Sequence, residues 1–265
     1  MKQILCFLYI LLFILPGNDL FAAPAVDNLF LKANRFYLDG NFKEAVSAYK
    51  AILQKIDYNS IISPGSSGEV FYNMGNCYHR LGENGRAILN YERASRLLPR
   101  DSDLNYNLEY LKETVKDKIE SNGNSIFGIF FWIKSFSGKE LFTVFSAVSF
   151  FFFFLLILRL YYKTEFIFYM LIISFIIYLI SGISFGIKSY QLKFDSRAVV
   201  LDTSASVLAG PDTGDTLLFK IHEGTILFFE RKEQNFSLIR FQDGRRGWLL
   251  SSSIASINPG KYNKT

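Results

Sequence analysis

The chain contains few of the residues on which most enzymes and metal proteins depend. It has two histidines and two cysteines among 265 residues. His79 and His222 lie far apart, and "HEGT" at 222–225 lacks the second histidine of a zinc-protease helix, so it is interpreted as a turn. No nucleophile stands beside a residue that would act as its base. We therefore predict that the protein is not an enzyme and uses no cofactor and no metal.

Cysteine is too scarce for a disulfide framework. Cys6 lies in an apolar run near the N-terminus, so Cys77 is the one cysteine left if that run is removed. A single cysteine forms no internal disulfide, even in an oxidising compartment. Cys77 occupies a position where the helical pattern requires a small buried residue, and we expect an inert thiol in the core.

Excess charge of one sign is absent outside the apolar third of the chain. Residues 26–120 carry 13 Lys and Arg against 13 Asp and Glu, and residues 194–265 carry 9 against 8. Residues 121–193 carry 6 against 2, so the positive excess flanks the apolar segments. A nucleic-acid partner requires a concentrated basic face and is therefore not expected.

Phenylalanine and long uncharged runs are abundant instead. Leu141–Leu158 and Phe166–Ile187 contain no charge, and as helices each would reach about 30 Å, the thickness of the hydrocarbon layer. We predict transmembrane helices at 141–162 and 166–187, joined by a tight connector and preceded by an interfacial linker at 121–140. Membrane lipid is therefore an expected partner.

Two glycines in the second run have the spacing that lets helices approach closely in lipid. Gly182 and Gly186 form a GxxxG pair near its end. Packing against the first helix of the hairpin and dimerisation both remain open.

The first 25 residues have the layout of a secretory signal peptide, with a basic residue, an apolar run and then small residues. Cleavage and retention as a membrane anchor both remain open. Either would export residues 26–140, and the hairpin would return the rest of the chain to the same side. The positive-inside rule alone favours the reverse, because Arg159 and Lys163 in the connector are outnumbered by five basic residues at the outer ends: Lys134, Lys139, Lys188, Lys193 and Arg197. We expect the signal to dominate, which places both soluble parts on the outer side of the membrane.

Two segments share one spacing of small and aromatic residues. Ala33 and Gly75 are each followed by an aromatic residue at offset 3, glycine at 7, alanine at 12 and tyrosine at 16. Small residues let two antiparallel helices approach, aromatic rings fill the space between them, and the glycine makes the turn. This is the tetratricopeptide pattern. It predicts a domain at 26–120, with repeats at 26–59 and 68–101 and a cap helix at 102–120, in which Leu104, Leu108 and Leu111 share one face.

The inward face of the first helix in each repeat is predicted to form a partner-binding groove. Polar groups between aromatic rings suit an extended peptide or a partner helix. The predicted groove residues are Phe30, Asn34, Tyr37, Tyr72, Asn76, His79 and Arg80.

From Arg197 onward the hydrophobic period changes to that of strands. Short β-rich runs broken by Gly, Pro and Asp turns predict a small all-β barrel at 194–258.

The order of signal, paired-helix repeats, membrane hairpin and small barrel resembles the BatE family of the Bacteroides aerotolerance operon. Its most telling stretches are "YNMGNCYHRLGENGRAILNYERASRLLPRDSDLNYNLEYLK" and "AVVLDTSASVLAGPDTGDTLLFKIHEGTILFF…GRRGWLL". The second is similar to a bacterial SH3 domain, with Gly247-Trp248 as its late-strand signature, although Phe236 stands where such domains commonly have Trp. The similarity implies an aromatic surface on the barrel, formed by Phe236 and Trp248.

The resemblance implies a multi-domain membrane protein that acts beside von Willebrand A-domain membrane proteins and an AAA+ ATPase in oxidative or envelope stress. It supplies no catalytic residues. We therefore expect a non-enzymatic periplasmic scaffold that binds partner proteins through its repeats. The alternative is a cell-wall sensor or anchor, in which the barrel binds peptidoglycan and the repeats are a spacer.

Overall fold

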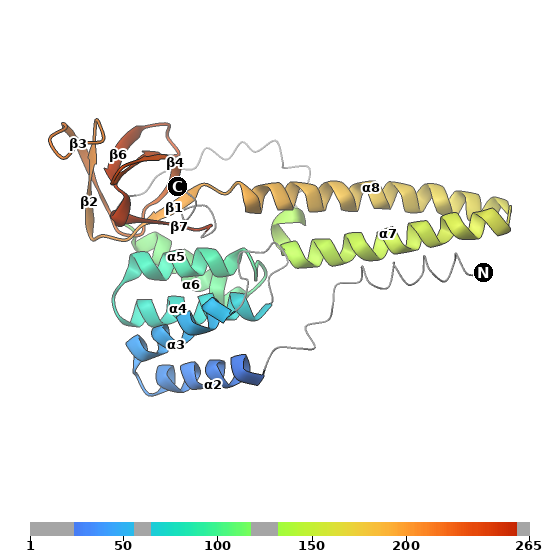
Figure 1. The fold of residues 1–265 in the computed structure, drawn as a ribbon, viewed down its shortest axis with the longest axis horizontal. Helices are drawn as coiled ribbons and strands as arrows, with labels where there is room; N and C mark the ends of the chain where they lie inside the picture. The colour runs from blue at the N-terminus through green and yellow to red at the C-terminus, as the bar shows by residue number, and fades with distance from the viewer. Residues whose placement is uncertain (1–23, 56–64, 118–131, 259–265) are drawn as a thin grey trace.

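The structure, a computed structural model, describes residues 24–55, 65–117 and 132–258. This described part holds seven α-helices and one seven-stranded antiparallel sheet. Helices α2–α6 and the sheet lie together at one end, and α7 and α8 project from them as a long hairpin (Figure 1). The prediction of a mixed helical and sheet protein with two membrane-length helices is confirmed. The signal peptide predicted at 1–25 lies outside the described residues, except for Pro24 and Ala25.

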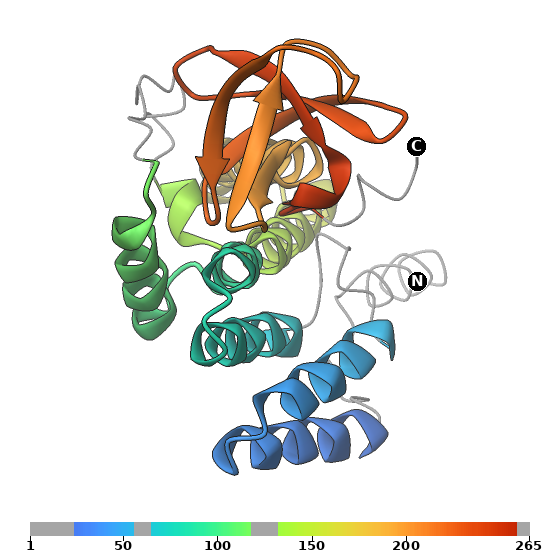
Figure 2. The same ribbon diagram turned by 90° about the vertical axis from the view of Figure 1, so that its left-hand side faces the viewer.

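Five helices make up the helical region, in two antiparallel pairs followed by a single helix (Figures 1 and 2). The first pair packs on the second, and the last helix packs on the second pair. The helices are α2 (Pro24–Leu38), α3 (Phe42–Lys55), α4 (Gly65–Arg80), α5 (Asn84–Ser95) and α6 (Ser102–Thr114).

The two helix pairs turn in the same way at positions 42 residues apart. Gly40 and Gly82 have φ of +78° and +75°, in the left-handed region that favours glycine. In each turn the amide after the glycine donates to a carbonyl five residues earlier, Asn41 N to Phe36 O at 2.8 Å and the equivalent pair in the second turn at 2.9 Å. The predicted glycine turns are therefore confirmed.

Close helix approach within each pair depends on the predicted small residues. Ala33 is fully buried, and a Cβ on Gly75 would come within 2.4 Å of the Tyr91 ring. Cys77 is also fully buried, and burial raises the pKa of its thiol to about 12. The prediction of an inert core thiol is confirmed.

Helix α6 caps the helical region, as its leucine spacing predicts. Leu104, Leu108 and Leu111 are all buried, and the Asp101 carboxylate caps the helix by accepting from Leu104 N at 2.9 Å. The helix ends at Thr114, earlier than predicted, because Val115 adopts an extended conformation and packs toward the sheet.

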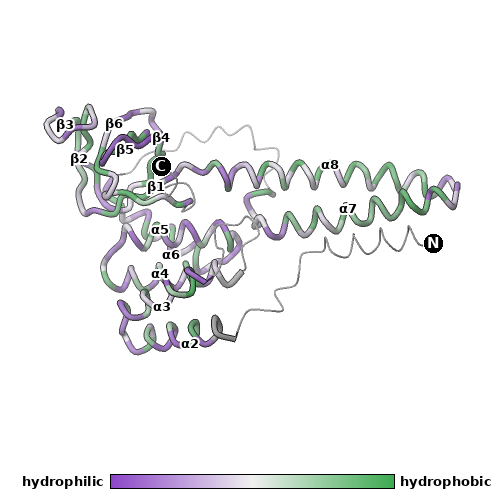
Figure 3. Tube along the Cα trace, viewed as in Figure 1, coloured by the Kyte–Doolittle hydropathy of each residue, from purple (hydrophilic) through white to green (hydrophobic). Residues whose placement is uncertain are grey.

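Helices α7 (Gly138–Tyr161) and α8 (Glu165–Lys193) form the hairpin. Both are long and apolar enough to cross a membrane, and only 11% and 6% of their most apolar windows are buried by the rest of the chain (Figure 3). Phe145 stacks on Tyr178 and on Phe185, with ring centroids 5.5 Å and 5.9 Å apart. The uncovered apolar surface separates these helices from the core helices of a soluble body.

The two glycines of α8 differ in what they face. A Cβ on Gly182 would meet the Phe145 ring at 3.1 Å, whereas a Cβ on Gly186 would meet nothing within 4 Å. Gly182 therefore lets α8 approach α7, and Gly186 does not contribute to packing inside the hairpin.

The sheet contains seven strands in the order β3-β2-β6-β5-β4-β1-β7, and it curls on itself (Figure 2). Its apolar core includes Val200, Leu227, Ile239 and Leu249. The strands are β1 (Arg197–Val200), β2 (Ser204–Leu208), β3 (Leu217–His222), β4 (Ile226–Glu233), β5 (Phe236–Arg240), β6 (Arg246–Leu250) and β7 (Ile254–Ser256).

The helical region and the sheet share one core instead of being separated by the hairpin. Val199 and Ile257 belong to the apolar cluster of the helices. Gly85 approaches so closely that a Cβ there would lie 2.6 Å from the Val200 carbonyl oxygen. We call this contact the seam: α5, α6 and residues 115–117 on one side, and β1, β7 and the β3–β4 turn on the other.

Candidate functional site

A cavity of about 360 Å³ opens on the helical region, and five of the seven predicted groove residues line it. Helices α2, α4, α5 and α6 all contribute side chains, so the cavity exists only when the two pairs and the cap are assembled. We call it the groove, and it is lined by Tyr37, Tyr72, Asn76, His79, Arg80, Tyr91, Asn107, Tyr110 and Leu111.

Phe30 and Asn34 were predicted in the groove but do not line it. Phe30 packs edge-on against the Tyr49 ring, with centroids 6.0 Å apart. The Asn34 side-chain oxygen accepts hydrogen bonds from the Tyr49 hydroxyl and from Asn73 Nδ2. Both residues therefore join α2 to its neighbours and lie outside this cavity, and their partner-binding role stays a prediction.

Asn76 is the equivalent of Asn34 in the second pair, and it lines the groove while also supporting it. Its side-chain oxygen accepts from the Tyr91 hydroxyl at 2.6 Å and from Asn107 Nδ2 at 3.5 Å. Asn107 also donates to the Tyr72 hydroxyl at 3.2 Å. These bonds fix a polar floor, because the nearly buried Tyr91 hydroxyl would otherwise lack a partner.

The tyrosines of the floor act as neutral hydrogen-bonding groups. Burial is the largest cause that raises the pKa of Tyr72, and burial likewise raises the pKa of Tyr91. Both hydroxyls therefore stay protonated at neutral pH and keep a proton to donate. A floor of phenols and amides offers donors and acceptors but no nucleophile.

The rim of the groove carries its only strong charge. Arg80 is exposed and makes no hydrogen bond or ion pair with any residue in the described ranges. Beside it, His79 Nδ1 lies 3.3 Å from Asn84 Oδ1, and its ring meets the Tyr110 ring edge-on at 6.5 Å. The rim thus combines an unpaired cation with aromatic surface, a combination enriched at protein interfaces.

The prediction missed the contribution of α6. Asn107 and Tyr110 are three residues apart and so lie on the same side of this helix. That spacing is present in the sequence, but the prediction used only the leucine face of this helix.

The predicted aromatic surface of the barrel is wrong. Phe236 and Trp248 are only 7% and 6% exposed. They lie on β5 and β6, which are interior strands of the sheet, and the Arg231 guanidinium lies 5.2 Å from the Trp248 ring centre. These rings are therefore part of the fold and form no platform for a ligand.

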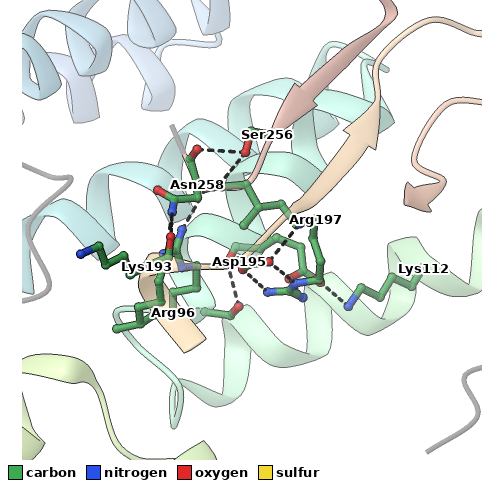
Figure 4. Close-up of polar contacts among 11 residues, drawn as sticks. Arg96, Lys112, Lys193, Asp195, Arg197, Ser256 and Asn258 are labelled. Atoms are coloured by element: carbon green, nitrogen blue, oxygen red, sulfur yellow. Dashed lines mark hydrogen bonds and ion pairs between the residues drawn. The ribbon is translucent and has the colours of Figure 1, made fainter. Parts of the chain in front are cut away.

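Buried charges at the seam form the second polar cluster of the molecule (Figure 4). The Glu92 side chain is 3% exposed and pairs with Lys112 and with Arg197, whose Nη1 lies 2.8 Å away. Arg197 also makes a two-point contact with Asp195, through Nε at 3.0 Å and Nη2 at 2.9 Å. Burial alone would raise the pKa of Glu92, but the charges of Arg197 and then Lys112 lower it.

The same cluster holds the end of the hairpin (Figure 4). Arg96 donates to Leu192 O at 2.8 Å and to Ile257 O at 3.1 Å, and Asn258 Nδ2 donates to Leu192 O at 3.1 Å. These donors satisfy a carbonyl in the last turn of α8. Helix α8 thus continues six residues beyond its predicted end at 187, into the seam.

The "HEGT" segment is a turn, as predicted, and the structure adds its role. Glu223 accepts from Gly85 N at 3.2 Å, in the first turn of α5. Asp117 accepts from His222 N at 2.6 Å and from Thr225 Oγ1 at 2.9 Å, and these bonds outweigh burial to lower its pKa. The turn therefore fastens the sheet to the helical region.

Within the described residues, no group of three His, Cys, Asp or Glu is placed to hold a metal ion.

Comparison with known proteins adds no family assignment. No family model matches the chain, and no curated protein matches it either.

Proposed function

We propose that the protein is a membrane-anchored scaffold without catalytic activity, and that it binds a partner protein in the groove. The observation that carries this proposal is Arg80, which has no hydrogen-bond or ion-pair partner among the described residues and lies at the rim of a cavity lined by tyrosines and asparagines. Amides and phenols can pair with a peptide backbone, and the rings and the guanidinium add contact area and charge. The partner we expect is an extended segment or a helix that carries a carboxylate.

The hairpin supports the anchoring half of the proposal. Two uncovered apolar helices of 24 and 29 residues are long enough to cross a bilayer. The seam then holds the groove at a fixed position relative to α8, because Arg96 and Asn258 bind the last turn of that helix. We propose that the hairpin lies in the bacterial inner membrane with both soluble parts on the periplasmic side, as the signal-like N-terminus favours.

The identity of the partner follows from the resemblance to the BatE family. The helix pairs would be tetratricopeptide repeats, which their 42-residue equivalence supports: the glycine turns and the tyrosine–asparagine bonds recur at matched positions. The sheet would be an SH3-like barrel. In that family setting the groove would bind a von Willebrand A-domain membrane protein in a complex for aerotolerance or envelope stress.

Site-specific photo-cross-linking in cells tests this assignment. A photoreactive amino acid at Tyr110, which lines the groove, is compared with one at Tyr106, which lies on the same helix and is more exposed at 71% but does not line the groove. We expect adducts with A-domain membrane proteins from position 110 and few from position 106. Equal labelling from both positions would remove the groove from the proposal.

The alternative, in which the sheet binds peptidoglycan, draws no support from Phe236 and Trp248, because both rings are buried. We therefore do not propose peptidoglycan as a ligand. Sedimentation of the full-length protein with purified wall material, without any cross-linked protein partner, would reverse this choice.

A further inference from the structure

We infer that one end of the hairpin holds a site for the headgroup of an anionic phospholipid, built from Trp132, Lys134 and Lys188. This is the end next to the helical region and the sheet, opposite the connector, and we call it the membrane-proximal end. The inference rests on the proposed membrane-spanning hairpin and is independent of the groove. The site takes a phosphate that carries net negative charge, and we assign that phosphate to lipid of the surrounding bilayer.

The position of Lys188 along the hairpin places it at headgroup depth. Gly138 lies 23 residues before Tyr161, and Lys188 lies 23 residues after Glu165, so these two residues are level across the antiparallel pair. At about 1.5 Å per residue this level is about 35 Å from the connector, just beyond a hydrocarbon layer of about 30 Å. This level corresponds to the depth of the lipid phosphates and not of the acyl chains.

Lys188 is buried, and it forms no ion pair with any residue that the structure describes. Lys188 is only 7% exposed, and its Nζ donates a hydrogen bond to Ile133 O at 3.3 Å. An ammonium group has three donors, and no described carboxylate lies within ion-pair distance. Glu140 in the first turn of α7 is already engaged by Arg100 and by Ser137 N. A buried cation without an ion-pair partner among the described residues is stabilised by an anion from outside the chain.

The neighbouring residues complete a site at the same depth. Lys134 adjoins the carbonyl that Lys188 binds, is exposed, and makes no hydrogen bond or ion pair with another described residue. Trp132 Nε1 donates to Ser184 Oγ at 3.2 Å, which fixes the indole against α8. Tryptophan favours the layer between headgroups and acyl chains, and lysines at this level attract anionic lipid.

The opposite end of the hairpin lacks this arrangement. Arg159 donates to Thr164 O at 2.9 Å within the connector, and Glu165 follows nearby. Among the basic residues at the membrane-proximal end, Arg197 is neutralised at the seam by Asp195 and Glu92. The positive charge that faces lipid at that end is therefore carried by lysines, and it complements anionic headgroups whichever way the hairpin is oriented.

The test is the thermal midpoint of the full-length protein in nanodiscs of phosphatidylcholine alone or of an equal mixture with phosphatidylglycerol. We expect the anionic mixture to raise the midpoint by about 2–4 °C. Lys134→Gln with Lys188→Gln should abolish this rise, and Lys134→Gln alone should reduce it. Lys163→Gln, which removes the same charge from the connector, and Arg80→Ala in the groove should both retain it.

An equal midpoint in the two kinds of disc, or loss of the rise in Lys163→Gln as well, would overturn the inference. So would a matching rise when inorganic phosphate is added to the phosphatidylcholine discs, because the site would then take a free anion. Lys134→Gln keeps the test valid if Lys188→Gln is unstable, since Lys134 is exposed. A protein that enters neither kind of disc would contradict the membrane-spanning hairpin itself.

Discussion

The seam and the groove share helices α5 and α6 and both contain polar side chains. They differ in whether the charged side chains have partners within the described part of the chain. At the seam, Glu92 is buried and meets two cations. In the groove, Arg80 is exposed and meets no partner among the described residues. Removing one partner from a buried pair costs about 3–5 kcal/mol, whereas an exposed cation costs little to leave unpaired. A charged side chain therefore indicates a binding surface only where no other side chain of the fold pairs with it.

The largest expected effect comes from breaking the buried pairs of the seam. Arg197→Ala should lower the free energy of unfolding by about 3–5 kcal/mol, because the buried carboxylate of Glu92 and the nearly buried carboxylate of Asp195 lose the counter-charge that they share. Urea unfolding of the full-length protein in detergent measures it. The matched control is Glu83→Ala, which breaks an exposed pair with Arg86 at 3.0 Å and should cost less than about 1 kcal/mol. Equal losses in the two variants would show that the seam is not a structural lock.

A second expected loss comes from the close approach of the β3–β4 turn. Gly224 has φ of +82°, and a Cβ there would lie 2.7 Å from Ile88 Cδ1 and 2.8 Å from Val115 Cγ2. Gly224→Ala should therefore cost about 1–2 kcal/mol for the backbone and about 1–3 kcal/mol more for the overlap.

Gly244→Ala separates those two causes. Gly244 has φ of +89°, but a Cβ there would meet nothing within 4 Å. The difference between the two melting midpoints thus isolates packing at the seam. If Gly244→Ala is as harmful as Gly224→Ala, the close approach contributes nothing.

Acid should weaken the seam before it affects the groove. The pKa of Glu92 is held below its ordinary value of 4.5, and that of Asp117 is also lowered. A carboxylate with a lowered pKa contributes stability that is complete above its ordinary pKa and is lost as the pH falls through the folded value. Thermal midpoints should therefore be steady near neutrality and fall below about pH 4.5. Glu92→Gln should flatten this fall, and an unchanged slope would exclude Glu92 as its source.

The smallest effects on stability should come from the two tyrosine–asparagine hydrogen bonds, one in the groove and one at the equivalent place in the first helix pair. Tyr91→Phe removes the hydroxyl that binds Asn76 and should cost about 1 kcal/mol, as should Tyr49→Phe at the equivalent bond to Asn34. Unfolding of the two variants should match within error if the pairs are equivalent. A loss in only one variant would show that the two hydrogen bonds contribute unequally to the free energy of unfolding despite their matching geometry.

Local features of this fold could be predicted from the sequence because they depend on short-range sterics. The turn glycines, the small residues between paired helices and the leucines of α6 all follow from spacing within one or two helices. The uncharged runs likewise predict α7 and α8, since apolar length alone determines them.

The seam could not be predicted, because its contacts join residues far apart in the chain. Glu92 and Arg197 are 105 residues apart, and neither has a spacing that points to the other. The burial of Phe236 and Trp248 could not be predicted for a related reason. Phe236 and Trp248 lie in five-residue strands whose two faces differ only after the sheet has curled, so an aromatic residue there gives no sign of which side it takes.

The groove stands between these cases. Five of its residues follow from the inward face of α2 and α4, but the roles of Asn34 and Asn76 depend on tyrosines of the following helices. A repeated asparagine with a tyrosine fifteen residues later was visible in the sequence and indicates a structural bond. Asn76 is consequently unsuitable for testing binding alone, whereas Arg80 is suitable.

The most direct test of the scaffold is therefore partner capture by Arg80→Ala beside Arg86→Ala. Both arginines belong to the helical region, but Arg86 pairs with Glu83 and does not line the groove. After cross-linking in cells and purification in mild detergent, we expect Arg80→Ala to recover at least about tenfold less A-domain membrane protein. We expect its melting midpoint to be unchanged and Arg86→Ala to capture the partner as the natural chain does. Equal capture by both variants would contradict the groove as the binding site.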